Sequence, residues 1–215
     1  MTGVQSEATR QRDAICRVGH SLFSRGLTSG STGNLSVRLG DGTMLMTPTN
    51  SCLGELDPAR LSHLDADGRL LGGDAPTKEA RLHQCFYCRP DAGAVVHLHS
   101  THAVAVSLLP ETPADNALPP LTAYYVMRVG TLPMLPYFPP GSGELFDAVA
   151  DVASAHQAVL LAHHGPVVAG KTLQDAQYAM EELEETARLQ LLVRSFGPKT
   201  LSATEVEDLM ARFGR

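Results

Sequence analysis

The sequence of 215 residues predicts a layered α/β domain, because short strand-like segments alternate with segments of helical periodicity. No internal repeat or low-complexity tract divides the chain, so we expect a single domain over residues 1–215. A chain of this length can bury a substantial hydrophobic core without disulfides or a structural metal. A metal site in it would therefore be functional.

The N-terminal half contains signals for two helices and at least two strands. Apolar residues at helical spacing predict a helix over residues 7–24, which the glycine-rich segment "RGLTSGSTGN" ends. The alternation in "NLSVRL" predicts a strand, "TMLMTP" is typical of a second one, and "LDADGRLLGGDAPT" predicts a hairpin. Pro76 favours a helix start and Pro90 follows its end, which places Glu79 in the first turn.

The C-terminal half continues the alternation. "AGAVVHLH" predicts a strand, "STHAVAVSLL" a helix, and residues 110–140 are proline-rich and expected to be irregular apart from "TAYYVMRVG". A helix is predicted over "GSGELFDAVADVASAH", and strands over "AVLLAHHG" and "PVVAG". A long amphipathic helix follows from Thr172 to about Arg194, and Ser202 with Glu205 forms a capping-box signature for a last helix.

Composition favours small-molecule chemistry. The formal net charge is -6 and the lysines and arginines are scattered, so we expect no nucleic-acid or anionic-membrane partner. The sequence contains neither a signal-peptide pattern nor an apolar stretch that could span a membrane, which favours a cytoplasmic protein. Four cysteines suit that compartment as reduced thiols, and the pair Cys85 and Cys88 is expected inside a helix, where we assign it no function.

Histidines gather in "AVVHLHSTH" and "AHHG". Residues two apart in a strand point to one face, so His97 and His99 can bind one metal ion together. A third ligand is expected from "AHHG": His164 is preferred because it stands at the strand exit, and His163 remains the alternative. Three neutral imidazoles with an open position are typical of a catalytic zinc-like site. His102 is expected in the next helix, where it orients a ligand or has no role. The competing interpretation is that all these histidines only pack at strand ends.

Glu79 lies in "PTKEA", where a glutamate serves either the helix dipole or acid–base chemistry. Thr77 and Lys78 precede it at a helix N-terminus, whose exposed N–H groups attract anions. The glycine-rich "SGSTGN" adds backbone donors, so the two segments together favour a phosphate cradle. The sequence has no G-K-[ST] motif there, which excludes a nucleotide P-loop.

Taken in order, "GSTGNLSVR", "MLMTPTN", "PTKEARLH", "AVVHLHSTH" and "LLAHHGPVVAG" resemble the class II aldolase/adducin family over roughly residues 10–195. The resemblance implies a three-layer α/β/α fold with a central, mainly antiparallel sheet, and a homotetramer with active sites at subunit interfaces. It implies Zn²⁺, or another divalent metal such as Mn²⁺ or Co²⁺, on His97, His99 and His164, with Glu79 as acid–base residue. It places phosphate binding on Gly33, Asn34, Thr49, Asn50, Thr77 and Lys78.

The resemblance also implies a catalytic tyrosine that reaches across the interface, at Tyr124 or Tyr125. Where sugar-phosphate aldolases of the family carry two serines before the glutamate, this sequence has Thr77 and Lys78. That departure, with "YYVMRVGTLPMLPY", resembles the branch acting on a 3-oxo-tetronate 4-phosphate. It implies a carbon–carbon lyase that forms dihydroxyacetone phosphate and CO2 through a metal-stabilised enediolate in sugar-acid catabolism.

Two other functions remain open on the same scaffold. The first is a sugar-phosphate aldolase or epimerase, similar to fuculose-phosphate aldolase or ribulose-phosphate 4-epimerase. The second is a non-catalytic interaction module of the adducin kind. The presence of all three candidate ligands together with Glu79 argues against the second.

Overall fold

The structure is a computed structural model that describes residues 6–213. In these residues eight strands form one sheet in the order β4-β3-β2-β1-β5-β8-β7-β6. Neighbouring strands are antiparallel, except for the parallel pair β6 and β7. The strands are β1 (Asn34–Arg38), β2 (Met44–Met46), β3 (Ser62–Leu64), β4 (Leu70–Gly72), β5 (Ala94–His97), β6 (Met134–Leu135), β7 (Ala158–Leu161) and β8 (Gly165–Gly170).

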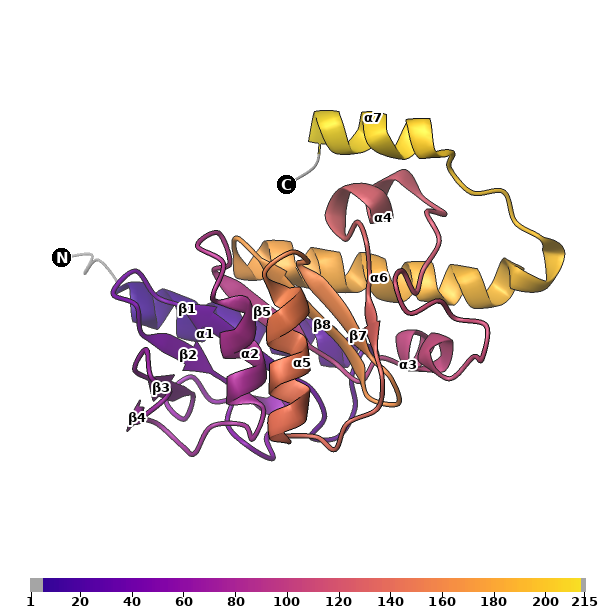
Figure 1. Cartoon of the computed structure of the whole chain (residues 1–215). Coiled ribbons are helices and arrows are strands. Elements are labelled where there is room, and N and C mark those ends of the chain that lie inside the picture. The colour runs from indigo at the N-terminus through magenta and orange to yellow at the C-terminus, as the bar shows by residue number, and fades with distance from the viewer. Residues whose placement is uncertain (1–5, 214–215) are drawn as a thin grey trace.

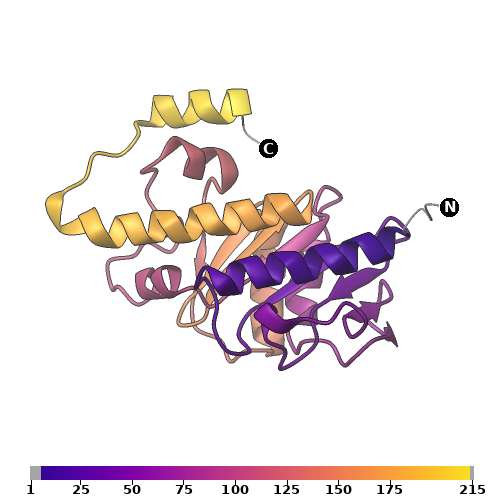
Figure 2. The ribbon, with the colours of Figure 1, turned by 180° about the vertical axis from the view of Figure 1, so that it is seen from behind.

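Helices cover both faces of this sheet. The helices are α1 (Glu7–Ser24), α2 (Ala80–Phe86), α3 (Thr101–Ser107), α4 (Ala123–Arg128), α5 (Gly143–Ala153), α6 (Leu173–Val193) and α7 (Ala203–Phe213), with short 3-10 turns at η1 (Leu53–Glu55) and η2 (Arg194–Phe196). Of these, α7 lies apart from the sheet, beyond α4 (Figure 1). Figure 1 shows α2 and α5 in front of the sheet, and Figure 2, seen from the opposite side, shows α1 and α6 side by side over the other face. The predicted three-layer α/β/α fold with a mainly antiparallel sheet is confirmed. In this part of the chain no helix combines the length and the apolar character that crossing a membrane requires.

Strand β5 lies between the two larger hydrophobic cores. Successive residues of a strand point to opposite faces, so Val96 packs in the core beneath α1 and α6 while Val95 packs with Leu82 of α2. His97 has the same parity as Val95, and its imidazole therefore lies on the α2 face. Because Glu79 directly precedes α2, this register brings the histidine and the glutamate to one place.

The predicted helix after Pro76 is shorter than expected. It begins at Ala80, whose N–H donates to the Thr77 carbonyl oxygen at 3.2 Å, so Glu79 occupies the N-cap position and not the first turn. The helix ends at Phe86, and the expectation that both cysteines lie inside it is wrong for the exposed Cys88. After α2 the N–H groups of Tyr87 and Arg89 donate to carbonyl oxygens three residues earlier, at 3.1 Å and 3.2 Å, so Cys88 lies in a turn and not in the α-helix.

Of three further predictions about local structure, two are confirmed and one is wrong. The hairpin in "LDADGRLLGGDAPT" is confirmed as the pairing of β3 with β4. The capping box is confirmed, because the Ser202 N–H donates to the Glu205 carboxylate at 2.8 Å and the Glu205 N–H donates to Ser202 Oγ at 3.4 Å. The irregular stretch 110–140 was expected to lack a strand at Met134, but residues 134–135 add a parallel strand because their backbone hydrogen-bonds beside β7.

A buried carboxylate on α6 fixes the start of α3. The backbone N–H groups of His102 and Ala103 each donate to the Glu184 carboxylate at 2.9 Å, and His102 Nδ1 lies 2.8 Å from its Oε1. Ser100, the N-cap residue of α3, makes no side-chain capping bond, so Glu184 takes over that function from another helix. His102 is therefore held by Glu184 of α6, and it does not belong to the cluster formed by His97, His99 and His164.

Replacing Glu184 with alanine should destabilise the fold by about 1 to 3 kcal/mol, because buried N–H donors of α3 lose their acceptor. Urea denaturation followed by circular dichroism measures the change. Glu185→Ala is the matched control on the same helix, since Glu185 is exposed and its ion pair with Arg188 lies on the surface. Equal stability of the two variants would contradict the capping role.

Candidate active site

Four side chains from three segments converge at one end of β5. They are Glu79, His97, His99 and His164, and each offers a ligand atom within 4.8 Å of the others. His97 Nε2 lies 3.3 Å from His164 Nε2 and 3.5 Å from Glu79 Oε2, while His164 Nε2 lies 3.2 Å from Glu79 Oε1. The structure thus brings together all three predicted metal ligands and the predicted acid–base residue.

The turn between β7 and β8 delivers His164 to the end of β5. Strand β5 pairs with β8 in a register that places His97 opposite Val167, so the turn before β8 reaches the exit of β5. Gly165 has φ +148°, and a Cβ there would stand 2.2 Å from the Leu98 carbonyl oxygen. Only glycine permits this close approach of the two backbones. The approach places the imidazole of the preceding residue, His164, beside that of His97.

The two histidines of "AHHG" have different surroundings. His163 is exposed with a left-handed φ of 60°, its N–H donates to Ser107 Oγ at 3.1 Å, and its ring stands 6.0 Å from that of Tyr137. His164 is buried and its ring centroid lies 4.6 Å from that of His99. The geometry therefore favours His164 as the third ligand.

The three clustered imidazoles are neutral. Burial lowers the pKa of His97, of His99 and of His164, the last to about 4. His97 Nδ1 lies 2.9 Å from the Pro166 carbonyl oxygen, which can only accept, so the proton is on Nδ1 and the lone pair of Nε2 faces the cluster. A backbone acceptor that fixes the tautomer in this way is typical of metal-ligating histidines.

The donor set suits a divalent cation. Among residues 6–213, Glu79 Oε1 and His99 Nε2 are buried without a hydrogen bond. Burying lone pairs without partners costs free energy unless something else satisfies them. Three neutral nitrogens and one carboxylate oxygen within reach of each other are ligands that zinc and its neighbours among divalent metals accept.

Glu79 is ionised in this setting. Burial raises the pKa of its carboxyl, while the charge that His97 carries when it is protonated and the hydrogen bond from Asn34 Nδ2 to Oε2, at 2.8 Å, lower it, and the net shift is downward. Because the neighbouring histidines are neutral at pH 7, the Asn34 amide is the hydrogen-bond donor that supports the carboxylate there. A carboxylate in this state accepts a proton before it can donate one.

A buried chain of polar groups lies behind Asn34, and the sequence analysis did not identify it. His83 Nε2 lies 2.5 Å from Asn34 Oδ1, His83 Nδ1 lies 2.7 Å from Ser36 Oγ, and Ser36 Oγ lies 2.6 Å from the Tyr87 hydroxyl. Burial lowers the pKa of His83 to about 3. The available signal was the spacing in "EARLH", which puts Glu79 and His83 four residues apart on one side of α2.

The predicted phosphate-binding positions fall into two groups. The loop of Thr49 and Asn50 lies beside the segment that carries Thr77, because Thr49 N–H donates to the Ala75 carbonyl oxygen at 3.0 Å and Pro48 bridges Pro76. Lys78 is exposed in that same segment, free to meet an anion.

Gly33 and Asn34 face inward. Gly33 has φ +79°, and a Cβ there would stand 2.9 Å from the His97 carbonyl oxygen. The Asn34 side chain is engaged by Glu79 and His83. Gly33 therefore lies close to the backbone of His97, and the Asn34 side chain contacts the Glu79 carboxylate.

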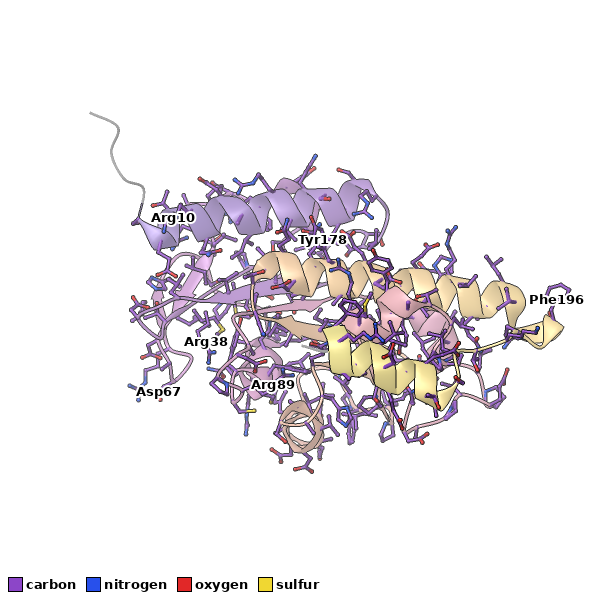
Figure 3. All side chains as sticks on the ribbon, turned by 90° about the horizontal axis from the view of Figure 1, so that it is seen from above. Arg10, Arg38, Asp67, Arg89, Tyr178 and Phe196 are labelled. Atoms are coloured by element: carbon purple, nitrogen blue, oxygen red, sulfur yellow. The ribbon has the colours of Figure 1, made fainter. Side chains whose placement is uncertain are left out.

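The two candidate tyrosines do not join the cluster of this chain. Tyr125 is buried in the core, and its hydroxyl has no hydrogen-bond partner among the described residues. Tyr124 is 60% exposed, and its ring lies 6.0 Å from the Arg128 guanidinium. Arg128 also stands 5.3 Å from the ring of Tyr178, which Figure 3 labels on α6. Tyr124 thus belongs to an outward-facing surface of α4 and α6.

The metal-free protein should lose stability as the pH falls from 6.5 towards 4. Histidines of the unfolded chain titrate near 6.5, whereas burial lowers the pKa of His164 to about 4 and that of His83 to about 3. Protonation therefore favours the unfolded chain, and the stability present above pH 6.5 declines below it. Urea denaturation at a series of pH values measures this decline, which should be shallower in metal-free His164→Ala. A flat wild-type profile in that window would contradict it.

Comparison with known proteins agrees with this architecture. Residues 13–191 match the family model of the Class II Aldolase and Adducin N-terminal domain. The chain is 47% identical over 199 residues to the 3-oxo-tetronate 4-phosphate decarboxylase of Escherichia coli K12, with 92% of this chain and 94% of that protein covered. It is 37% identical over 193 residues to the L-fuculose phosphate aldolase of Escherichia coli K12, with 87% and 86% covered. The solved structure of YgbL from Escherichia coli is similar with a TM-score of 0.93 at 45% identity, over 95% of this chain and 99% of that one. The chain belongs to the class II aldolase and adducin family.

Proposed function

We propose that this protein is a metal-dependent carbon–carbon lyase that decarboxylates a 3-oxo-tetronate 4-phosphate to dihydroxyacetone phosphate and CO2. The observation that carries the proposal is the Glu79 carboxylate within 3.5 Å of the Nε2 atoms of His97 and His164. The 47% identity to a decarboxylase of that name, against 37% to an aldolase, favours this reaction over aldol cleavage.

The substrate's own chemistry fits such a site. A 3-oxo-tetronate 4-phosphate is a β-keto acid, so its C1–C2 bond can break with the electron pair moving towards the C3 carbonyl. CO2 leaves and an enediolate remains, which takes up one proton at C2 to become dihydroxyacetone phosphate. A divalent cation held by His97, His99 and His164, Zn²⁺ or another such as Mn²⁺ or Co²⁺, would supply Lewis-acid stabilisation of the developing negative charge.

Glu79 is proposed to move the proton. Its resting carboxylate can accept the proton of the substrate C2 hydroxyl and deliver it to the C2 carbon, after which solvent returns a proton to the hydroxyl oxygen. Thr77 and Lys78 are proposed to bind the substrate phosphate, together with the backbone at Gly33 and the loop of Thr49 and Asn50. Asn34 was expected on phosphate, and its observed contact supports a role on Glu79.

An exposed tyrosine supports the oligomeric part of the proposal. Tyr124 is proposed to enter the active site of a neighbouring subunit in a homotetramer. Its ring is exposed and lies on a surface shared with Arg128 and Tyr178. A phosphorylated substrate and four free cysteines are compatible with a cytoplasmic place of action, which belongs to the same proposal.

The deciding experiment offers the metal-loaded protein a 3-oxo-tetronate 4-phosphate and, separately, ketose 1-phosphates. CO2 and dihydroxyacetone phosphate from the acid, without aldehyde from the ketoses, supports the decarboxylase. Aldehyde release from a ketose 1-phosphate without CO2 from the acid would replace it with an aldolase. Epimerisation of a pentulose phosphate, with neither product, would replace it with an epimerase.

Replacing Lys78 with alanine should lower kcat/KM by roughly tenfold to more than a hundredfold, because a charge-assisted hydrogen bond to a substrate anion is worth about 1.5 to 3 kcal/mol. Dihydroxyacetone phosphate as a competitive ligand identifies the anion, since it carries phosphate but no carboxylate. Equal weakening of both ligands assigns Lys78 to phosphate, which we expect. Selective weakening of the acid assigns it to the carboxylate, and unchanged binding of both would remove either role.

A further inference from the structure

The polar chain behind Glu79 has one possible direction of hydrogen bonding. The Asn34 amide must turn its Nδ2 towards the carboxylate, since its oxygen would be repelled there, and so Oδ1 faces His83. An amide oxygen only accepts, so His83 carries its proton on Nε2 and its Nδ1 is an acceptor. Ser36 therefore donates to Nδ1, and its oxygen accepts the Tyr87 hydroxyl proton. Every donor in the chain points towards Glu79.

The scaffold holds this chain rigidly. Ser36 and His83 have no exposed surface, and Asn34 is 5% exposed. Asn34 and Ser36 lie on one face of β1 in the middle of the sheet, while His83 lies on α2, one turn after Glu79. Arg38, labelled in Figure 3, donates to the carbonyl oxygens of Tyr87 at 3.0 Å and Pro90 at 2.8 Å, which ties the end of α2 to β1. Arg38 thus fixes the Tyr87 end of this row of hydrogen-bonded groups.

We propose that His83 is a positioning residue for the reaction, which holds the Asn34 amide in the one orientation that supports the Glu79 carboxylate. The inference rests on the proposed function of Glu79. Free rotation of the Asn34 amide would let its oxygen face the carboxylate, and Glu79 would then turn away. A fixed carboxylate matters because a displacement of about 1 Å at a reacting group can lower the rate about a hundredfold.

The test compares two substitutions at His83 with a matched control in the metal-loaded enzyme. His83→Leu removes both hydrogen bonds and should lower kcat roughly 10- to 100-fold with KM little changed. His83→Gln keeps one donor and one acceptor and should recover most of that loss. His63→Leu removes a histidine on β3, far along the sheet from β5, that pairs with Thr43 Oγ1 at 2.8 Å, and kcat should stay at the wild-type value.

A double-mutant cycle separates positioning from general damage to the fold. If His83 acts through Glu79, then His83→Leu should cost no further activity in a Glu79→Gln background. Additive losses would overturn the inference, as would wild-type kcat in His83→Leu. If His83→Leu fails to fold, Ser36→Ala provides the milder loss, because it leaves His83 Nδ1 without its donor, and the same non-additivity with Glu79→Gln is required.

A crystal structure of metal-loaded His83→Leu provides a readout that needs no substrate. The Asn34 amide and the Glu79 carboxylate should leave their wild-type positions or become disordered, while the three imidazoles stay. Unmoved Asn34 and Glu79 would overturn the inference. If the wild-type enzyme releases no CO2, the proposed function fails, and this structure still decides whether His83 positions Glu79.

Discussion

Replacing Glu79 with glutamine should lower kcat of the metal-loaded enzyme by about 10²- to 10⁴-fold, the range expected when a general acid–base group is lost. Glutamine keeps the shape and the hydrogen bond with Asn34, so folding and metal content should remain close to wild type. The Glu79 carboxylate is ionised at rest because its pKa is lowered, and the glutamine amide can neither accept the substrate proton nor return it.

The control for Glu79 is Glu144→Gln, the same substitution in the first turn of another helix, α5, where the side chain is exposed. A role limited to the helix dipole predicts small, similar effects of the two substitutions. Steady-state kinetics measures both variants. The protein must be fully loaded with metal, because the Glu79 carboxylate lies so close to the three imidazoles that it can move into the place of a missing metal ion. Turnover of Glu79→Gln near the wild-type value would return Glu79 to a dipole role.

Replacing His97 or His164 with alanine should abolish tight binding of a divalent ion and, with it, activity. Each variant removes one of the three proposed nitrogen ligands, and the two imidazoles that remain should bind a divalent ion much more weakly than three. Elemental analysis of the purified variants measures the bound metal. Full occupancy in both variants would show that these histidines do not form the site.

His163→Ala is the matched control for His164→Ala, since it removes the adjacent imidazole. We expect it to retain metal, because His163 is exposed and its ring packs towards Tyr137. Should His163→Ala lose metal while His164→Ala keeps it, the site would stand and only the choice within the pair would be wrong.

Several elements of the site follow from local sequence alone. The spacing of His97 and His99 places them on one side of an extended segment, because side chains alternate along it. The structure ends β5 at His97, yet both rings remain together, since their centroids are 5.0 Å apart. The helix after Pro76 and the glycine-rich turn before β1 are equally local, and their signals were sufficient to place Glu79 and Gly33 near the ends of those elements.

Local patterns in the sequence predicted a layered α/β domain, the H-x-H pair and the glutamate near the start of α2, because each depends on periodicity or on turn chemistry within a few residues. The three-layer arrangement with a mainly antiparallel sheet was implied only by the family resemblance. The strand exit already favoured His164 over His163 in the sequence, and the tertiary structure adds the close approach of Gly165 to the backbone at Leu98, which places the His164 ring beside His97 and His99. Only the tertiary structure revealed the hydrogen-bonded chain through His83 and Ser36 and the contact of Asn34 with the Glu79 carboxylate. Such contacts join β1 to α2 across more than 40 residues of sequence, and no local pattern encodes which partner a buried polar group will meet.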